Sequence, residues 1–255
     1  MKQRIIDKLK QLEHDQQIRI LLAVETGSRA WGFPSPDSDF DIRLIYVKEA
    51  DWYIRLTEGK DNISYMSEDG ELDLTGWELR KALRLMAKSN TALLERVQSP
   101  IVYLEDGDFA QEMRSLASDF YSPVAVMHHY YSMALKSFDD IKYKETYRLK
   151  SLFYALRATC ACLWILEQDR NPPIVYSELL AGLKLAPNLS EKIASLTMLK
   201  ATKSESYMHP KDEDLVTFIT ETLIIIKQAK NDLQPSKGNT ESLNVFLRSK
   251  IVFKK

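Results

Sequence analysis

The chain has 255 residues, enough for one large domain or two ordinary ones with a substantial core. Hydrophobic residues make up 45% of it and charged residues 28%, as in a soluble globular protein. The 35 basic and 36 acidic residues give a net charge of −1, which excludes a broadly basic nucleic-acid-binding chain but not a local basic groove.

Nothing in the sequence predicts secretion or membrane insertion. Charges are scattered through residues 1–7, so this segment lacks the apolar core of a secretory signal. No apolar run approaches the ~20 residues that a membrane helix needs, and the longest lies around 223–226. Cys160 and Cys162 fall inside a helical pattern with no His or Cys cluster nearby, which indicates reduced packing residues. We therefore expect a cytoplasmic protein.

The first elements frame the most informative stretch of the chain. Apolar residues at helical spacing predict a helix over 3–14, and an apolar run predicts a strand over 19–24. A turn at Gly27–Ser28, a short helix near 28–32 and a second strand over 39–47 follow. Alternate strand residues face opposite sides, so the apolar residues of the second strand share one face. The other face carries Asp39, Asp41 and Arg43.

This arrangement predicts a site for a metal and a phosphate. Two carboxylates on one face repel each other unless a cation lies between them, and Mg²⁺ or Mn²⁺ accepts such oxygen ligands. Gly27 lets the backbone approach a ligand closely, and the amides that open the following helix point toward an anion. Nucleotidyl transfer requires both of these parts.

The next segment reads as a hairpin followed by a helix. Strands are expected over 62–66 and 71–74, with turn chemistry at 67–70 between them. Asp73 points away from the apolar face of its strand. Thr75 and Glu78 match a capping box, which predicts a helix from Thr75 to about residue 88. A helix over 90–97 and a strand over 101–104 complete this part.

From about residue 122 the pattern is helical throughout. Helices are expected over 122–138, over 145–168, from 177, from 190 and over 212–232, and a linker is expected over 231–240 before a last short helix. The predicted fold class is therefore α+β, with a mixed sheet and flanking helices followed by an all-α bundle. We place a catalytic domain at 1–119 and a helical, nucleotide- or substrate-binding domain at 120–255.

The central stretch also resembles a known signature. Gly27-Ser28, ten intervening residues and Asp39-x-Asp41 are similar to the signature of the DNA polymerase β-like nucleotidyltransferase superfamily. The wider run, from Gly27 to Gly32 and from Ser38 to Arg43, resembles the YcgL-type branch, an RNA-repair-associated family of predicted nucleotidyltransferases.

The resemblance assigns roles to particular residues. It implies that Asp39 and Asp41 hold two Mg²⁺ or Mn²⁺ ions together with a third carboxylate on a later strand, for which Asp73 is the candidate and Glu71 the nearest competitor. Gly27 and Ser28, with Arg29 beside them, would cradle the triphosphate, and Arg43 would neutralise charge on the transferred phosphoryl group.

The resemblance also implies a helical domain with a basic residue on the triphosphate and an aromatic residue against the base. Lys150, Tyr154 and Arg157 are the candidates, because their i, i+4, i+7 spacing projects them together. A segment with Lys203 and Glu205 is weakly similar to the family, and Glu95 recurs in it without an assigned role.

The sequence thus predicts a metal-dependent transferase of nucleotides. The substrate would be a nucleoside triphosphate, with ATP favoured, and the acceptor an RNA 3′ end, with a protein hydroxyl (AMPylation) or a small-molecule hydroxyl as alternatives. A non-catalytic nucleotide-binding regulator or antitoxin-like protein is the second class, and an interaction module is the third. No membrane partner is expected, and the oligomeric state stays open.

Overall fold

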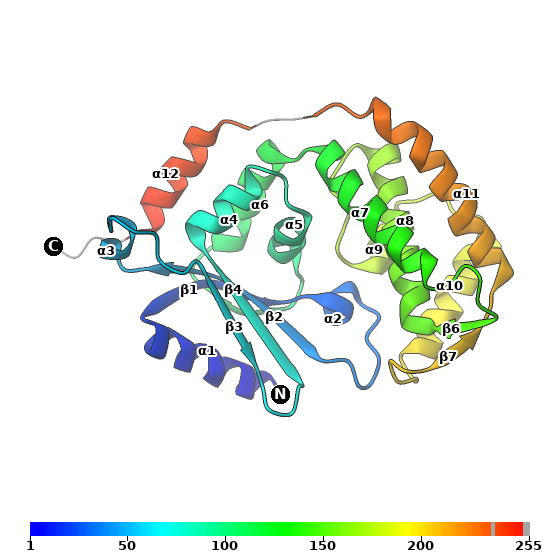
Figure 1. The fold of residues 1–255 in the computed structure, drawn as a ribbon, viewed down its shortest axis with the longest axis horizontal. Coiled ribbons are helices and arrows are strands. Elements are labelled where there is room, and N and C mark those ends of the chain that lie inside the picture. The colour runs from blue at the N-terminus through cyan, green and yellow to red at the C-terminus, as the bar shows by residue number, and fades with distance from the viewer. Residues whose placement is uncertain (236–237, 252–255) are drawn as a thin grey trace. The chain divides into compact units, whose positions relative to one another are not determined.

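A mixed β-sheet forms the core of the N-terminal part of the chain (Figure 1). The computed structural model describes residues 1–235 and 238–251. Five strands pair in the order β3-β4-β2-β1-β5. They are Ile18–Glu25 (β1), Phe40–Lys48 (β2), Asn62–Met66 (β3), Leu72–Glu78 (β4) and Val102–Glu105 (β5). All five expected strands are present.

The central strand pairing is parallel. β2 runs parallel to β4, with Asp41 opposite Asp73, and antiparallel to β1. β3 and β4 form the predicted antiparallel hairpin, and β5 pairs antiparallel with β1. Because neighbouring strands lie ~4.8 Å apart, this register places the residues at positions 41 and 73 side by side.

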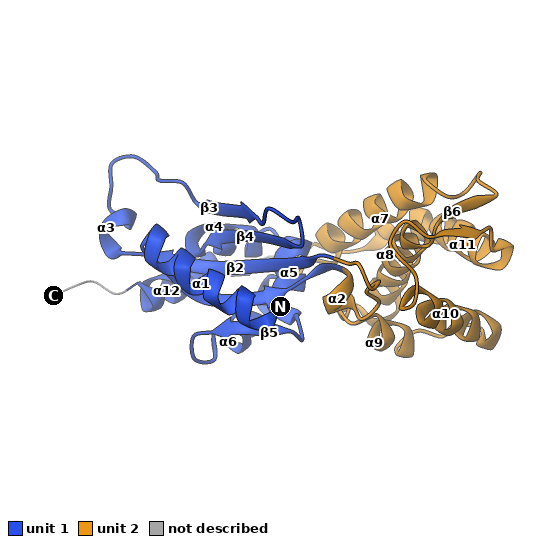
Figure 2. Ribbon diagram, turned by 90° about the horizontal axis from the view of Figure 1, so that it is seen from below, with its two compact units in different colours: residues 1–27, 39–120, 237–255 blue, residues 28–38, 121–236 orange. Residues whose placement is uncertain are grey.

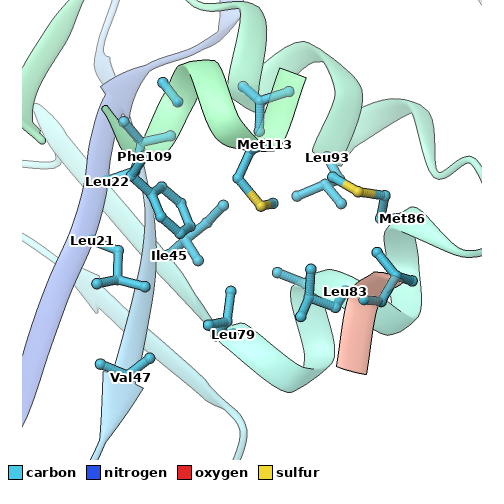
Figure 3. Packing of buried hydrophobic residues seen from close by; sticks show 14 of the residues in the cluster. Leu21, Leu22, Ile45, Val47, Leu79, Leu83, Met86, Leu93, Phe109 and Met113 are labelled. Atoms are coloured by element: carbon cyan, nitrogen blue, oxygen red, sulfur yellow. The ribbon is translucent and has the colours of Figure 1, made fainter. Parts of the chain in front are cut away.

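Each face of the sheet packs on its own helices. On one face, Ile42, Leu44 and Tyr46 of β2 join Ile5 and Leu9 of α1 (Lys2–Gln16) in a buried cluster. The other face packs against α4 (Leu79–Met86), α5 (Thr91–Gln98) and α6 (Phe109–Phe120), as Figure 3 shows. The predicted apolar face of β2 is therefore confirmed, and its opposite face is also covered toward the end of the strand.

The second part of the chain is helical, as predicted. Its helices are α7 (Pro123–Asp139), α8 (Leu149–Gln168), α9 (Tyr176–Ala181), α10 (Pro187–Lys200) and α11 (Glu213–Ala229). A short antiparallel pair of strands, Thr146–Arg148 (β6) and Met208–Pro210 (β7), is present that the sequence pattern does not predict. The remaining elements are α2 (Gly27–Trp31), α3 (Ala50–Tyr53), η1 (Lys230–Asp232) and α12 (Thr240–Lys250). Together with the mixed sheet, these helices confirm the α+β class.

The chain divides into two compact units, each made of separate segments (Figure 2). Unit 1 comprises residues 1–27, 39–120 and 237–255, and unit 2 comprises 28–38 and 121–236. Positions 236–237 of the predicted linker, and 252–255 at the end of the predicted second domain, lie outside the described residues.

This division differs from a single boundary after residue 119 in two places. Leu243 of α12 is buried in the cluster that includes α4, so the end of the chain returns to unit 1. Trp31 and Phe33 pack on Tyr154 and Phe153 of α8, with ring centroids 5.1 and 5.0 Å apart, so residues 28–38 belong to unit 2. In both cases a short segment buries its apolar side chains against a core that is distant in sequence.

The predicted capping box at Thr75 is wrong. β4 continues to Glu78, and residues 75–78 pair with β2 instead of starting a helix. The helix begins at Leu79, and the buried Glu78 carboxylate caps it by accepting the main-chain N–H groups of Arg80 and Lys81. Alternating burial along the strand, rather than the local cap signal, determines where this helix starts.

The expectation that no segment matches a membrane helix needs correction for α8. Within the described residues, α8 is one helix that is long and apolar enough to cross a membrane by length and composition. In the structure it is the central helix of unit 2, and 67% of its most apolar window is buried. Its apolar composition is that of a core helix.

We expect both cysteines to resist alkylation in the native protein. Cys160 and Cys162 are free and fully buried in α8, and burial raises the pKa of Cys160 to about 12. Since the thiolate is the reactive form, iodoacetamide at pH 8 should leave both thiols unmodified until the protein is unfolded in guanidinium. Mass spectrometry measures this, and labelling of the folded protein would contradict the described packing.

Candidate active site

Two acids and one arginine meet on the β2–β4 pair in unit 1. Arg43 Nη2 donates to Asp41 Oδ1 at 2.7 Å and to Asp73 Oδ2 at 2.8 Å. The three side chains are 20–24% exposed, so they are partly desolvated but reachable from water. The predicted common face of Asp41 and Arg43 is confirmed, and the parallel register adds Asp73 to it.

Arg43 is also fixed from the main chain. Its Nη1 donates to the carbonyl oxygens of Ile42 and Asp73, each at 3.1 Å. Charge-assisted hydrogen bonds of this kind are stronger than neutral ones. The guanidinium therefore lies between the two carboxylates, where the sequence predicts a metal ion, rather than pointing to a separate phosphoryl position.

The other two candidate acids are exposed. Asp39 lies one residue before β2, and its place in the site stays a prediction. Glu71 precedes β4, is exposed, and forms an ion pair with Arg4 at 3.4 Å. Within residues 1–235 and 238–251, no three His, Cys, Asp or Glu side chains lie close enough to hold a metal ion. Of the two alternatives, the register brings Asp73 rather than Glu71 beside Asp41.

Gly27 touches this cluster in a way that only glycine permits. Its φ is +65°, in the left-handed region. A Cβ on Gly27 would lie 3.2 Å from Asp41 Cγ and closer still to Asp41 Oδ2. The neighbouring Thr26 donates its N–H to the Asp41 carbonyl oxygen at 2.8 Å. Gly27 therefore lies against the Asp41 carboxylate, and its predicted close approach to a ligand stays a prediction.

Glu25 is a buried acid whose carboxylate bonds the main chain of Asp41, and the sequence pattern does not predict this role. Glu25 is fully buried at the end of β1. Its Oε1 accepts the Asp41 N–H at 2.7 Å, and its Oε2 accepts the Tyr103 hydroxyl at 2.6 Å. A charged residue directly after the five apolar residues 20–24 is the signal that could have identified it. Glu25 thus holds the main chain at Asp41 in place.

Replacing Glu25 with alanine should destabilise the protein by about 1–3 kcal/mol, because the Asp41 N–H loses a buried acceptor. Glu25→Gln keeps an oxygen at that position, so it should destabilise the protein clearly less than Glu25→Ala does. Urea unfolding of the two variants measures the difference. Equal destabilisation by both would show that the bond to the Asp41 N–H is not the stabilising contact.

A second buried charged residue packs against β2 and β4. Arg96 in α5 is 2% exposed, donates to the Leu44 carbonyl oxygen at 2.7 Å and stacks 3.7 Å from the Trp77 ring centre. Burial lowers the pKa of Arg96, and repulsion from Arg43 lowers it further. Arg96 therefore lies close enough to Arg43 for the two cations to repel each other.

In unit 2, the segment 28–38 is held by its own hydrogen bonds. Ser28 Oγ donates to Ser38 Oγ at 3.2 Å, and Arg29 Nη2 donates to the Ser38 carbonyl oxygen at 2.6 Å. The buried Lys200 donates to Ser35 Oγ at 2.8 Å. The side chains of Ser28 and Arg29, predicted as phosphate contacts, thus stabilise this loop.

Unit 2 also contains an open cavity of about 470 Å³. Lys150, Tyr154 and Glu205 line it, with a Lys150 Nζ to Glu205 Oε2 distance of 2.6 Å. Glu205 Oε1 accepts the Ser38 hydroxyl, and its N–H donates to Asp37 Oδ1, both at 2.9 Å. Glu205, which lies in the segment with weak resemblance to the family, therefore connects residues 37, 38 and 150 at this cavity.

The three predicted residues of α8 differ in exposure. Lys150 and Tyr154 line the cavity, whereas Arg157 is 2% exposed with its guanidinium 4.2 Å from the Trp31 ring centre. The same Trp31 ring packs on Tyr154, so Trp31 lies beside both residues. The role of all three in binding a nucleotide stays a prediction.

Comparisons with known proteins identify the family of this chain. Residues 1–249 match the family described as "RlaP: RNA repair pathway DNA polymerase beta family". A Bacillus subtilis (strain 168) protein named "Uncharacterized protein YcgL" is 39% identical over 248 residues, which cover 97% of this chain and 95% of the relative. A crystal structure of a nucleotidyltransferase-like protein from Exiguobacterium sibiricum 255-15 has a TM-score of 0.31 and 13% identity, covering 89% of this chain and 75% of that one.

The family match and the fold point to a polymerase β-like nucleotidyltransferase. The structural similarity is too distant to add to this. With the family match over nearly the whole chain and the close B. subtilis relative, the chain belongs to the RNA repair pathway DNA polymerase beta family.

Proposed function

We propose that this chain transfers a nucleoside monophosphate from a nucleoside triphosphate to an acceptor hydroxyl, with release of pyrophosphate and with a divalent metal ion. The observation that carries the proposal is the parallel register that sets Asp41 beside Asp73, with Gly27 packed against Asp41. Such chemistry depends on positioning and electrostatics rather than on a protein nucleophile.

Asp41 and Asp73 offer a divalent cation two carboxylate ligands, and water or phosphate oxygens would supply the others. Asp41 and Asp73 both bond one guanidinium nitrogen, so their oxygens already surround a position suited to a cation. Carboxylate oxygens are the ligands that Mg²⁺ and Mn²⁺ prefer. Asp41 and Asp73 would hold the metal, with Asp39 as the further candidate. When bound, the metal would neutralise charge on the phosphoryl oxygens.

The chain's own groups would then position the reactants. Glu25 fixes the main chain at Asp41, and Gly27 leaves room for the Asp41 carboxylate. Lys150 and Tyr154 are candidate nucleotide contacts in the cavity of unit 2. Two cations and three acids line this cavity, namely Arg148, Lys150, Asp37, Asp140 and Glu205. This balance favours a base or ribose over a triphosphate.

We favour ATP as the nucleotide and an RNA 3′ end as the acceptor. The description of the family supports the RNA acceptor. The net charge of −1 does not favour a broad RNA surface, but a single end needs few phosphate contacts.

One observation favours a second candidate, a nucleotide-binding protein without turnover. Arg43 occupies the space between Asp41 and Asp73. A permanent ion pair there would keep a metal out.

Incubation of purified protein with each α-labelled nucleoside triphosphate, Mg²⁺ or Mn²⁺, and a mixture of cellular RNA and protein tests the proposal. The control is the double variant Asp39→Asn, Asp41→Asn. Label in RNA, with the variant silent, is the expected result. Label in protein would move the acceptor to a protein hydroxyl. No label in either fraction, with nucleotide binding retained by calorimetry, would favour the non-catalytic alternative.

A further inference from the structure

The structure gives Arg43 a position that a divalent cation would also need. Its Nη2 contacts one oxygen of each acid, and its Nη1 contacts two main-chain carbonyl oxygens. A cation bound to Asp41 and Asp73 would compete for the carboxylate oxygens that Nη2 now occupies. The carbonyl oxygens that Nη1 contacts belong to the main chain and do not take part in that competition.

The fold favours a cation at this place whether or not a metal is present. The parallel register forces Asp41 and Asp73 side by side on neighbouring strands. Two carboxylates that share a site destabilise each other's charged form unless a positive group lies between them. Arg43, two residues beyond Asp41 on the same strand face, supplies that group from within the chain.

We propose that Arg43 is a displaceable internal counter-cation, which stabilises the acid pair without metal and competes with the divalent cation for it. This inference rests on the proposed function and specifies how its metal site is regulated. The Arg43 side chain is 20% exposed, so it has access to water when it leaves the carboxylates. Its main-chain bonds provide a resting position nearby.

The proposal predicts effects of opposite sign on the two states. Without metal, loss of Arg43 leaves two repelling carboxylates, and the protein should unfold at a lower temperature. With metal, the competitor is gone, and the affinity for the cation should rise. If Arg43 had a merely structural role, its loss would damage the site itself. Both the melting temperature without metal and the affinity for the cation would then fall.

Calorimetric titration with Mn²⁺, in the absence of nucleotide, tests this on Arg43→Gln. We expect its dissociation constant to fall at least ~10-fold below that of the natural protein, within the ~5–150-fold range typical of coupled ligands. The melting temperature in EDTA should fall, and its rise on Mn²⁺ addition should be larger than for the natural protein. Arg43→Lys keeps the charge but cannot contact both acids through one guanidinium. Its dissociation constant and melting temperature should therefore lie between those of the natural protein and Arg43→Gln. It replaces Arg43→Gln in the test if that variant does not fold.

Arg4→Gln is the matched control. Arg4 likewise contacts two acids, Asp69 and Glu71, but at the exposed end of the β3–β4 hairpin. Its loss should leave the Mn²⁺ affinity unchanged. Asp41→Asn should abolish Mn²⁺ binding.

The outcomes separate the inference from the proposed function. One outcome is that Mn²⁺ binding depends on Asp41 but has the same dissociation constant in Arg43→Gln as in the natural protein. That result would overturn the role of Arg43 and leave the metal site intact. Failure of both the natural protein and Arg43→Gln to bind Mn²⁺ would overturn the metal site, and the inference with it.

Discussion

Gly27→Ala should abolish nucleotidyl transfer while leaving the protein folded. Two effects combine at this position. A non-glycine residue in the left-handed region costs about 1–2 kcal/mol, and Gly27 has a φ of +65°. In addition, the new Cβ would overlap the Asp41 carboxylate and push it from its position between Gly27 and Arg43. The second effect acts directly on a proposed metal ligand.

Gly107→Ala is the matched control for this change. Gly107 has a nearly equal φ of +61°, but no atom lies within 4 Å of its would-be Cβ. Both variants carry the backbone cost, and only Gly27→Ala carries the collision. Thermal melting should therefore show a loss in both and a larger one in Gly27→Ala, whereas the labelling assay should show activity in Gly107→Ala alone. Activity retained by Gly27→Ala would mean that Asp41 does not act where the structure places it.

Asp73→Asn should reduce kcat by more than the ~10–100-fold that loss of an outer-shell partner of a metal costs. Asp73 lies opposite Asp41 and shares the Arg43 guanidinium with it, so it is the acid best placed to complete the site. The change removes a charge but preserves the shape of the side chain, which limits its effect on folding.

Glu71→Gln separates this role from a general effect of acids in the hairpin. Glu71 is exposed, and its contact with Arg4 spans 3.4 Å, so its neutralisation should leave kcat within about twofold, as expected for a weak surface pair. Steady-state kinetics with saturating Mg²⁺ measures both variants. A larger loss in Glu71→Gln than in Asp73→Asn would reverse the assignment.

Local patterns in the sequence predict much of the acid cluster. Alternation along β2 places Asp41 and Arg43 on one face, and turn chemistry at 67–70 predicts the hairpin that carries Asp73. The strand itself begins one residue later than predicted, at Phe40 rather than Asp39. Strand ends depend on pairing partners, which a single sequence does not display.

Contacts between residues that are distant in the sequence determine the features of the site that local patterns do not predict. The Arg43 bridge depends on the register between β2 and β4, and the Glu25 bond depends on the way β1 ends beside Asp41. Arg157 follows the predicted stripe of α8, but Trp31, more than a hundred residues earlier in the chain, covers it. Helical spacing predicts which side chains of one helix project in the same direction. It does not predict which residues of other elements lie against them.

A comparison of α-labelled with γ-labelled ATP tests the central claim most directly. If the chain transfers a nucleotide, the α-label appears in the acceptor and the γ-label leaves in pyrophosphate, and both depend on Asp41, so that Asp41→Asn gives neither. Transfer of the γ-label to the acceptor would show phosphoryl rather than nucleotidyl transfer. Undiminished α-label transfer by Asp41→Asn would show that the chemistry does not take place at the β2–β4 acids.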